Sequence, residues 1–277
     1  MLFSVIVANY NNGAYLTELI HSIQKQTYTN WQLVIADDCS TDDSRQIMEQ
    51  YSGNENIILL FHKTNKGAAA TFKTAVDAAN GEIIGMLGAD DALVPQAIER
   101  MVQSHKQHPE ASLICSNLYE CDGHLTVLSI WDKYKAPQSH GSLIVNPSLG
   151  SFATFKKTCY LKTEGFDPAF KKALDHDIYL KLEEQGQVFY HDEPLYLYRA
   201  NPIGISQNTN WFEATIYSLQ ARRNAYKRRL NRTDIISLSE TEYRQLLKLQ
   251  YDRLALLNRT KKQYLDFLRY WFLSRIS

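Results

Sequence analysis

The chain has 277 residues, 44% of them hydrophobic and 22% charged, which is the range of ordinary globular proteins. This length allows one large domain with an appendage. No apolar run reaches the roughly 18–20 residues of a membrane-spanning helix, and the first residues show no secretion signal. We therefore expect a cytoplasmic protein. A disulfide framework or a zinc site is not expected, because no CxxC pair occurs among the four cysteines, which are Cys39, Cys115, Cys121 and Cys159.

The net charge of zero conceals an uneven distribution of charge along the chain. Residues 210–277 contain 14 Lys and Arg against 6 Asp and Glu, whereas the rest contains 16 against 24. A basic tail on an acidic body predicts that the tail meets something anionic. That partner is either a membrane surface, a second subunit or the body of the same chain. We expect no nucleic-acid partner.

Short apolar runs in the first part of the chain predict strands that are buried on both faces. They are rich in Ile, Val and Leu and alternate little with polar residues. Five such runs lie at residues 3–8, 32–36, 57–61, 82–87 and 112–118. Helical spacing of apolar residues lies between them, at residues 13–27, 67–80 and 95–108. Strands that alternate with helices predict an α/β fold, with a Rossmann-like, mostly parallel sheet flanked by helices.

The pattern changes beyond residue 118. Residues 119–209 are less regular and richer in loops, whereas residues 210–277 predict a helical C-terminal extension. Within that extension, Ser239 and Glu242 form a capping-box pattern, which predicts the start of a helix. The chain therefore divides into three segments, 1–118, 119–209 and 210–277.

Polar residues follow four of the predicted strands at the point where each strand ends. They lie in the stretches ANYNN (8–12), ADDCSTD (36–42), KTNKG (63–67) and GADD (88–91). Each stretch alone is explained by helix capping or by an ordinary loop. In a parallel sheet, however, the carboxyl ends of the strands share one edge, where ligands bind. The four stretches together predict a binding crevice.

In this order, the segments SVIVANYNN, VIADDCSTD, NKG and GADD resemble family-two glycosyltransferases, inverting enzymes with the GT-A fold. The resemblance is continuous from residue 3 to about 118 and looser to about 206. It implies that 1–118 is the nucleotide-sugar-binding half and 119–209 the acceptor-binding and catalytic half of one GT-A domain. Residues 210–277 are then a basic helical extension. A dinucleotide-binding dehydrogenase is a poor alternative, because no GxGxxG follows the first strand.

The resemblance also implies which residues contact the sugar donor. They are Ala8, Asn9, Tyr10, Asn11, Asp38, Lys66, Gly67, Asp90 and Arg199. Asp38 would accept a hydrogen bond from the nucleobase, and Asp90 would face the ribose or the sugar. Arg199 would reach the diphosphate, or alternatively form a surface ion pair.

The GADD stretch matches the metal-binding DXD-type motif of the family. The resemblance assigns Asp91 as the ligand of Mn²⁺ or Mg²⁺. Such cations prefer oxygen ligands and take one or two protein carboxylates, with phosphates and water at the other positions. The family often has Asp where this chain has Gly88, and helix capping is the alternative role for Asp90 and Asp91.

The stretch KKALDHDIYLKLEEQG (171–186) resembles the family pattern E-D-x-D-L-x-L-R, which opens a helix near the sugar. Asp175 falls on the position of the catalytic base, which takes the proton of the acceptor hydroxyl. Leu174 and Lys181 replace the usual Glu and Arg. Asp177 fits the second acidic position, or is a first-turn carboxylate of the helix.

The resemblance therefore implies a metal-dependent inverting glycosyltransferase. Its donor would be a nucleoside-diphosphate sugar, with uridine expected before thymidine and guanosine. Its acceptor would be a glycan or a lipid-linked molecule, in bacterial surface polysaccharide synthesis such as that of lipopolysaccharide. Residues 210–277 would attach the protein to the inner face of the plasma membrane or form a homodimer. A non-catalytic nucleotide-sugar-binding scaffold is the alternative. A nucleotidyltransferase is less favoured, because NYNNG lacks the basic residues that hold a triphosphate.

Overall fold

The computed structural model describes residues 1–132, 134, 136–147, 149–201, 211–235 and 238–260. Its strands are β1 (Phe3–Asn9), β2 (Trp31–Asp37), β3 (Ile57–Phe61), β4 (Ile83–Gly88), β5 (Ala92–Leu93), β6 (Ala111–Cys121), β7 (Val127–Ile130), β8 (Ser151–Lys156) and β9 (Gln187–Arg199). Its α-helices are α1 (Gly13–Gln24), α2 (Ser44–Glu49), α3 (Ala68–Ala78), α4 (Ala97–Gln107), α5 (Lys157–Tyr160), α6 (Leu174–Glu183), α7 (Trp211–Arg229) and α8 (Glu240–Thr260). A short 3₁₀ helix lies at Ser142–Ile144.

One sheet runs through the molecule in the strand order β3-β2-β1-β4-β8-β6-β9-β5, with β7 paired to β6. Strands β1 to β4 pair in parallel, and so do β6 and β9. Strand β8 lies antiparallel between β4 and β6, so β6 and β9 run in the same direction as β1 to β4. The sheet is therefore mostly parallel, with β5, β7 and β8 reversed.

Alternate residues of the central strands point into two separate cores, as the period of two in a strand requires. Val5 and Val7 pack with apolar residues of α1 and α4 on one face of the sheet. Ile6 and Val34 pack with α3, α6 and α7 on the other face. Both faces are covered, which explains why the strands appear in the sequence as continuous apolar runs.

The predicted fold class is confirmed. The five predicted strands are β1, β2, β3, β4 and β6, and the three predicted helices are α1, α3 and α4. The capping box is also present, because the Ser239 backbone N–H donates to Glu242 Oε2 at 2.8 Å and the Glu242 N–H donates to Ser239 Oγ at 3.3 Å. Helix α2 was not predicted, since its six residues are too few to show a period.

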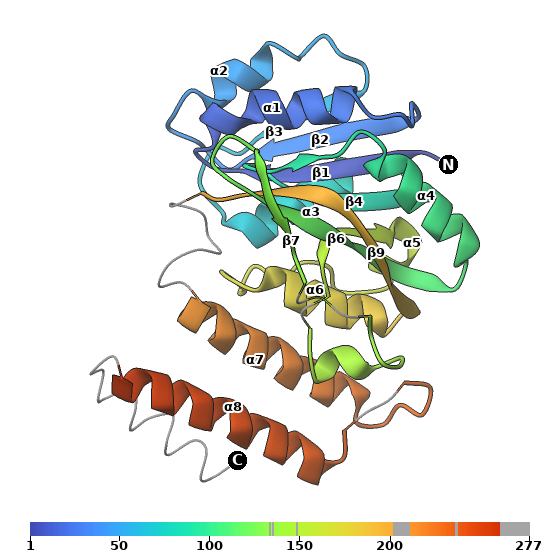
Figure 1. The fold of residues 1–277 in the computed structure, drawn as a ribbon, viewed down its shortest axis with the longest axis vertical. Helices are drawn as coiled ribbons and strands as arrows, with labels where there is room; N and C mark the ends of the chain where they lie inside the picture. Colours follow the sequence, from blue (N-terminus) through green and yellow to red (C-terminus); the bar gives the residue numbers. More distant parts are fainter. Residues whose placement is uncertain (133, 135, 148, 202–210, 236–237, 261–277) are drawn as a thin grey trace.

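Helices α6, α7 and α8 stack in this order away from the sheet (Figure 1). The α6–α7 contact contains Arg229, whose side chain is fully buried. Its guanidinium lies 3.0 Å from Glu183 and 3.1 Å from Glu184, and it also donates to the backbone oxygens of Leu180 and Gly141. Burial raises the pKa of Glu183, which the charge of Arg229 opposes. This ion pair joins the helical extension to the body.

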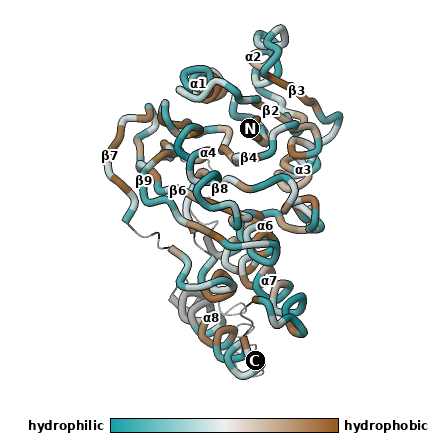
Figure 2. The backbone as a smooth tube through the Cα atoms, turned by 90° about the vertical axis from the view of Figure 1, so that its right-hand side faces the viewer, coloured by the Kyte–Doolittle hydropathy of each residue, from teal (hydrophilic) through white to brown (hydrophobic). Residues whose placement is uncertain are grey.

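The predicted helical extension is present as α7 and α8, at residues 211–229 and 240–260. Residues 261–277 lie outside the described residues. The prediction that the extension binds a membrane or a second subunit stays a prediction. Among the described helices, none is long and apolar enough to cross a bilayer. The edge strand β7 (Figure 2) exposes apolar side chains, with Leu128 exposed to 67%.

We predict that Arg229→Ala lowers the free energy of unfolding by about 3–5 kcal/mol, because it leaves the carboxylates of Glu183 and Glu184 buried without their cation. Urea denaturation would measure the change. The matched control is Arg244→Ala, which removes an exposed pair with Glu240 and should cost about 0.5 kcal/mol or less. Equal losses in the two variants would contradict the prediction.

Candidate active site

The carboxyl ends of β1, β2 and β9 and the first turn of α6 lie on the same side of the molecule, toward the left in Figure 1, where the sequence predicts the crevice. The parallel register places Asn9 beside Asp37 and Ala8 beside both Ala36 and Gly88. Three of the four polar stretches therefore begin on adjacent strands. The fourth, KTNKG, follows β3, which is paired with β2.

Asp37 fixes the loop that follows β2. Its carboxylate accepts hydrogen bonds from Asn9 Nδ2 at 2.7 Å, from the Ser40 N–H at 2.9 Å and from Ser40 Oγ at 2.5 Å. Ser40 Oγ in turn accepts from the N–H of Asn11, which has a φ of 55°. Asp37 therefore supports the turn between the end of β2 and the loop after β1. Next to them, Tyr10 is exposed to 47%.

Asp38 holds the loop after β3 against the end of β2. Its carboxylate accepts from the backbone N–H groups of Lys66 and Gly67, both at 2.8 Å, and lies 2.8 Å from His62 Nδ1. Burial alone would raise the pKa of Asp38, but the hydrogen bonds from His62 and from this loop lower it below its ordinary value. The carboxylate is therefore ionised at neutral pH and already accepts three hydrogen bonds.

Asp91 is buried and connects β4 to β9. Tyr196 donates its hydroxyl to Asp91 Oδ2 at 2.5 Å, and the Arg199 backbone N–H donates to Asp91 Oδ1 at 2.8 Å. Burial, together with the charge of Asp90, raises the pKa of Asp91 to about 7. Both oxygens therefore serve the fold.

Asp90 is the more open of the two carboxylates. Its Oδ2 accepts from Asn201 Nδ2 at 2.8 Å, and no hydrogen bond from the described residues reaches its Oδ1. The assignment of Asp91 as the metal ligand stays a prediction, and these contacts make Asp90 a second candidate. The residue at that position is enclosed with both oxygens occupied, whereas its neighbour presents a carboxylate oxygen.

Arg199 does not present a free guanidinium to a ligand. Its side chain is 2% exposed, and its nitrogens donate to the backbone oxygens of Asp90 and Gly123 and to Glu18 Oε2, each at 2.6 Å. The guanidinium also lies 4.7 Å from the ring centre of Tyr15. Of the two predicted roles, the structure shows the ion pair, and the contact to a diphosphate stays a prediction.

The position of Gly88 has no room for a side chain. A Cβ atom would lie 2.5 Å from Asp91 Oδ2 and 3.0 Å from the Tyr196 hydroxyl. The Gly88 N–H also donates to that hydroxyl, at 3.0 Å. The departure from the D-x-D-D pattern thus accompanies the hydrogen bond between Tyr196 and Asp91.

Asp175 lies in the first turn of α6, after Ala173, which has a φ of 50°. It is partly exposed, and no hydrogen bond or ion pair engages its carboxylate within the described part of the chain. The charge of Asp175 acts on neighbouring side chains. Burial raises the pKa of Tyr134 to about 12, and the negative charge of Asp175 contributes to this rise. A carboxylate that is open and unpaired can accept a proton.

Asp177 has a structural role instead. It is 1% exposed, and its Oδ2 accepts from Lys181 Nζ at 2.6 Å. Lys181 also donates to the backbone oxygen of Gly165 at 2.9 Å, which holds the preceding turn against α6. His176 Nδ1 lies 2.8 Å from Ser218 Oγ on α7.

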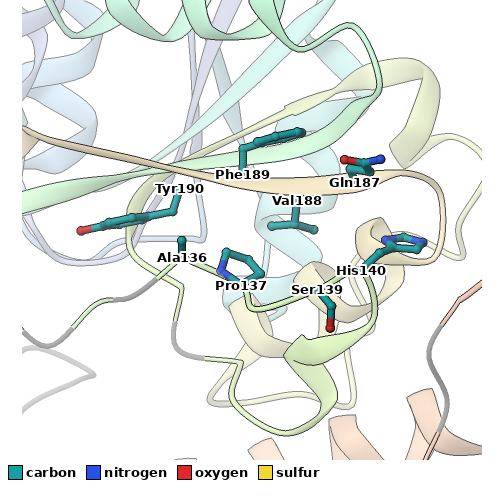
Figure 3. Close-up of a pocket in the computed structure, with 8 residues that line it drawn as sticks. All are labelled: Ala136, Pro137, Ser139, His140, Gln187, Val188, Phe189 and Tyr190. Atoms are coloured by element: carbon teal, nitrogen blue, oxygen red, sulfur yellow. The ribbon is translucent and has the colours of Figure 1, made fainter.

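A hollow of about 240 Å³ lies between residues 136–140 and the start of β9 (Figure 3). It is lined by Ala136, Pro137, Ser139, His140, Gln187, Val188, Phe189 and Tyr190. Tyr190 is about 30 Å of strand away from Arg199 at the other end of β9. Since no Asp, Glu, Lys or Arg lines it, this hollow does not suit a charged diphosphate.

Residues that fit a divalent cation are present at the end of β4. No cluster of three or more His, Cys, Asp and Glu side chains occurs in the described part of the chain. A cation at Asp90 would thus depend on ligand phosphates for most of its oxygen ligands, which is usual for Mg²⁺.

Sequence reasoning missed three residues of this site. His62 directly follows β3 and Asn201 lies two residues after the end of β9, so the rule that polar residues at strand ends meet at one edge could have found them. Tyr196 lies within β9, and nothing in the sequence distinguishes its hydroxyl from those of its neighbours.

Comparisons with known proteins show the family to which the chain belongs. The family model described as "Glycosyl transferase family 2" matches residues 4–148. The chain is 29% identical to the chondroitin synthase of Escherichia coli over 67% of its own length and 27% of that protein. It is 37% identical to glycosyltransferase GlyG of Streptococcus pneumoniae over 44% of its length and 40% of that protein. The match thus spans less than half of these relatives.

Solved structures share the fold. TarS of S. aureus in complex with UDP-GlcNAc aligns with a TM-score of 0.73 at 21% identity, over 98% of this chain and 79% of that chain. The mannosyltransferase PcManGT of Pyrobaculum calidifontis, in complex with GDP-Man and Mn²⁺, aligns with a TM-score of 0.59 at 15% identity, over 99% and 86%. At these identities the likeness establishes the GT-A fold alone.

We predict that Gly88→Ala lowers the free energy of unfolding by about 1–3 kcal/mol, because the added methyl group overpacks the contact between Asp91 and Tyr196. Thermal or urea denaturation would measure it. Gly53→Ala is the control, because a Cβ there meets nothing within 4 Å. A Gly88→Ala variant as stable as the wild type would show that this contact is not tight.

Proposed function

Because the chain belongs to glycosyl transferase family 2, we propose that it transfers a sugar from a nucleoside-diphosphate sugar to an acceptor hydroxyl, with inversion at the anomeric carbon. A UDP-sugar is the first expected donor, since TarS is described in complex with UDP and with UDP-GlcNAc. The acceptor is a glycan or a lipid-linked molecule of a bacterial surface polysaccharide. Relatives named for chondroitin synthesis and teichuronic acid biosynthesis support that class.

The observation that carries this proposal is the arrangement of Asp90 and Asp91. The buried Asp91 is fixed by Tyr196 and by the backbone of Arg199, and its neighbour Asp90 is partly open at the carboxyl end of β4. An ordinary helix cap would bond backbone N–H groups of α4. No side chain makes such a cap at the N-terminus of α4, so capping does not explain the two carboxylates.

The nucleotide would bind where the loops after β1, β2 and β3 meet. Tyr10 offers an exposed ring for the base. Asp38 would accept an N–H of the base at its carboxylate, which His62 and the backbone of Lys66 and Gly67 hold in place. Its contacts also fix Lys66 and Gly67 near the nucleotide. Asn9 and Asn11 shape the loop on the ribose side.

Asp90 would hold Mn²⁺ or Mg²⁺ together with the diphosphate. When bound, such a cation neutralises the charge that develops on the departing diphosphate. The chain contributes by fixing Asp90: Asn201 binds one of its oxygens, and Arg199 binds its backbone oxygen. Neither contact occupies Asp90 Oδ1.

Asp175 would take the proton of the acceptor hydroxyl as its oxygen attacks the anomeric carbon. The attack comes from the face opposite the diphosphate, which inverts the configuration and requires no covalent sugar–enzyme intermediate. The first turn of α6 and the carboxyl ends of the strands lie on the same side of the molecule (Figure 1), as this geometry requires.

We predict that Asp90→Asn abolishes the Mn²⁺-dependent part of UDP affinity, because it removes the charged oxygen that faces the crevice. Calorimetric titration of UDP, dTDP and GDP, with and without Mn²⁺, would measure it. Asp91→Asn is the matched variant and should mainly lower the unfolding temperature. If Asp91→Asn stays fully folded but loses the metal dependence, Asp91 is the ligand. If the wild type binds no diphosphate, the proposed function is wrong.

We predict that Asp175→Asn lowers kcat by about 10²–10⁴-fold, the usual contribution of a general base, and leaves UDP affinity unchanged. Turnover of the donor identified by calorimetry would measure it, with NMR of the product to show the anomeric configuration. Asp77→Asn, on the exposed face of α3, is the control. A wild type that binds the donor but transfers nothing to any acceptor would favour the non-catalytic scaffold.

A further inference from the structure

Two guanidinium nitrogens of Arg222 on α7 are buried without a hydrogen-bond partner in the described part of the chain. Its residue is 9% exposed, and its Nε and Nη1 atoms are buried without a hydrogen-bond acceptor. Burial lowers the pKa of Arg222 to about 10. Its helical neighbours Arg228 and Arg229, in contrast, both pair with carboxylates of α6.

An unpaired charge in such a place is costly. Removing a cation from water without a counter-ion costs several kcal/mol, and guanidinium groups at pH 7 do not lose their proton to avoid it. The segment 202–210, which joins β9 to α7 in the sequence, contains no Asp or Glu. The structure therefore has a positive position whose negative partner is missing among the described residues.

Arg222 lies beside the first turn of α6. Ser218, one turn earlier on α7, is 2.8 Å from His176 Nδ1. Burial lowers the pKa of His176, and Arg222 adds to this effect while Asp175 opposes it. The cation therefore lies near the residue that follows the proposed base. In that region the acceptor, rather than the nucleotide, must bind.

We propose that Arg222 forms an anion-binding subsite that takes a carboxylate or phosphate group of the acceptor. This inference rests on the proposed function, because it takes Asp175 as the base. The proposed function places the diphosphate of the donor at the end of β4 instead. Arg222 is not among the charges that act on Asp91 at that strand end, which are Asp90 and Arg199. The acceptor is accordingly an acidic glycan or a phosphate-containing chain.

Paired probes test this inference. Methyl β-D-glucuronide and glycerol 1-phosphate, with methyl β-D-glucoside and glycerol as their neutral matches, would be titrated by NMR, with and without UDP and Mn²⁺. The wild type should bind one anionic probe at least about tenfold more tightly than its neutral match, as expected for a charged hydrogen bond. A preference for the glucuronide would identify a carboxylate as the group that Arg222 binds, and a preference for glycerol 1-phosphate would identify a phosphate.

The variants are Arg222→Gln, Arg222→Lys and the control Arg223→Gln, whose side chain lines the groove between α7 and α8. Arg222→Gln should abolish the anionic preference, Arg222→Lys should keep part of it, and Arg223→Gln should keep it all, with UDP affinity the same in each. This comparison reports on Arg222 even if the wild type binds no UDP, a result that would sink only the proposed function.

Two results would overturn the inference. A wild type that binds anionic and neutral probes equally shows that Arg222 does not receive an anion from outside, and this result requires no variant to fold. A loss of UDP affinity in Arg222→Gln, at an unchanged unfolding temperature, shows that the anion is the diphosphate of the donor.

Discussion

The fold of the site depends on one buried carboxylate. Asp91, at the end of β4, accepts hydrogen bonds from the Tyr196 hydroxyl and from the Arg199 backbone, both on β9. These contacts join the two halves of the domain across 105 and 108 residues of sequence. The Arg199 side chain continues the connection to Glu18 on α1 and to Gly123 after β6. A buried carboxylate that lost these donors would be strongly destabilised, so the junction permits little variation.

The two neighbouring carboxylates therefore have different tasks. Asp91 holds the strands together, and because it is fixed, the backbone of Asp90 is fixed as well. Around them, the loops after β1 and β2 are bound by short side-chain contacts from Asp37 and Ser40, and Asn11 and Cys39 adopt left-handed backbone conformations there. Such conformations persist only where the surroundings determine them. The loops after β1 and β2 are thus held by contacts within the chain, which would reduce the ordering that binding of a ligand requires.

The sequence could predict most of the first half, because its strands are buried on both faces and its helices show a clear period. The position of polar residues at strand ends predicted that these stretches gather at one edge of the sheet, which the parallel register confirms. It could not rank Asp90 against Asp91, since the partners that bury one of them lie more than 100 residues away. Arg199 was ambiguous for the same reason: its ion pair with Glu18 depends on how β9 returns beside β4. Asp177 and Lys181 resemble ordinary members of a helix face, and only the turn at Gly165 reveals why they are buried.

The uneven charge of the chain has a partial internal explanation. Arg228 and Arg229 of the basic extension meet Glu183 and Glu184 of the acidic body, and Arg232 donates to the backbone oxygen of Glu184. The extension therefore packs against its own body through opposite charges, which was one of the alternatives from the sequence. Arg222 differs from these three: it is buried on α7, and its Nε and Nη1 atoms have no hydrogen-bond acceptor among the described residues. Arg228 and Arg229 meet carboxylates at one end of α7, whereas Arg222, near the proposed base, meets none among the described residues, and this contrast is why we assign Arg222 to a ligand.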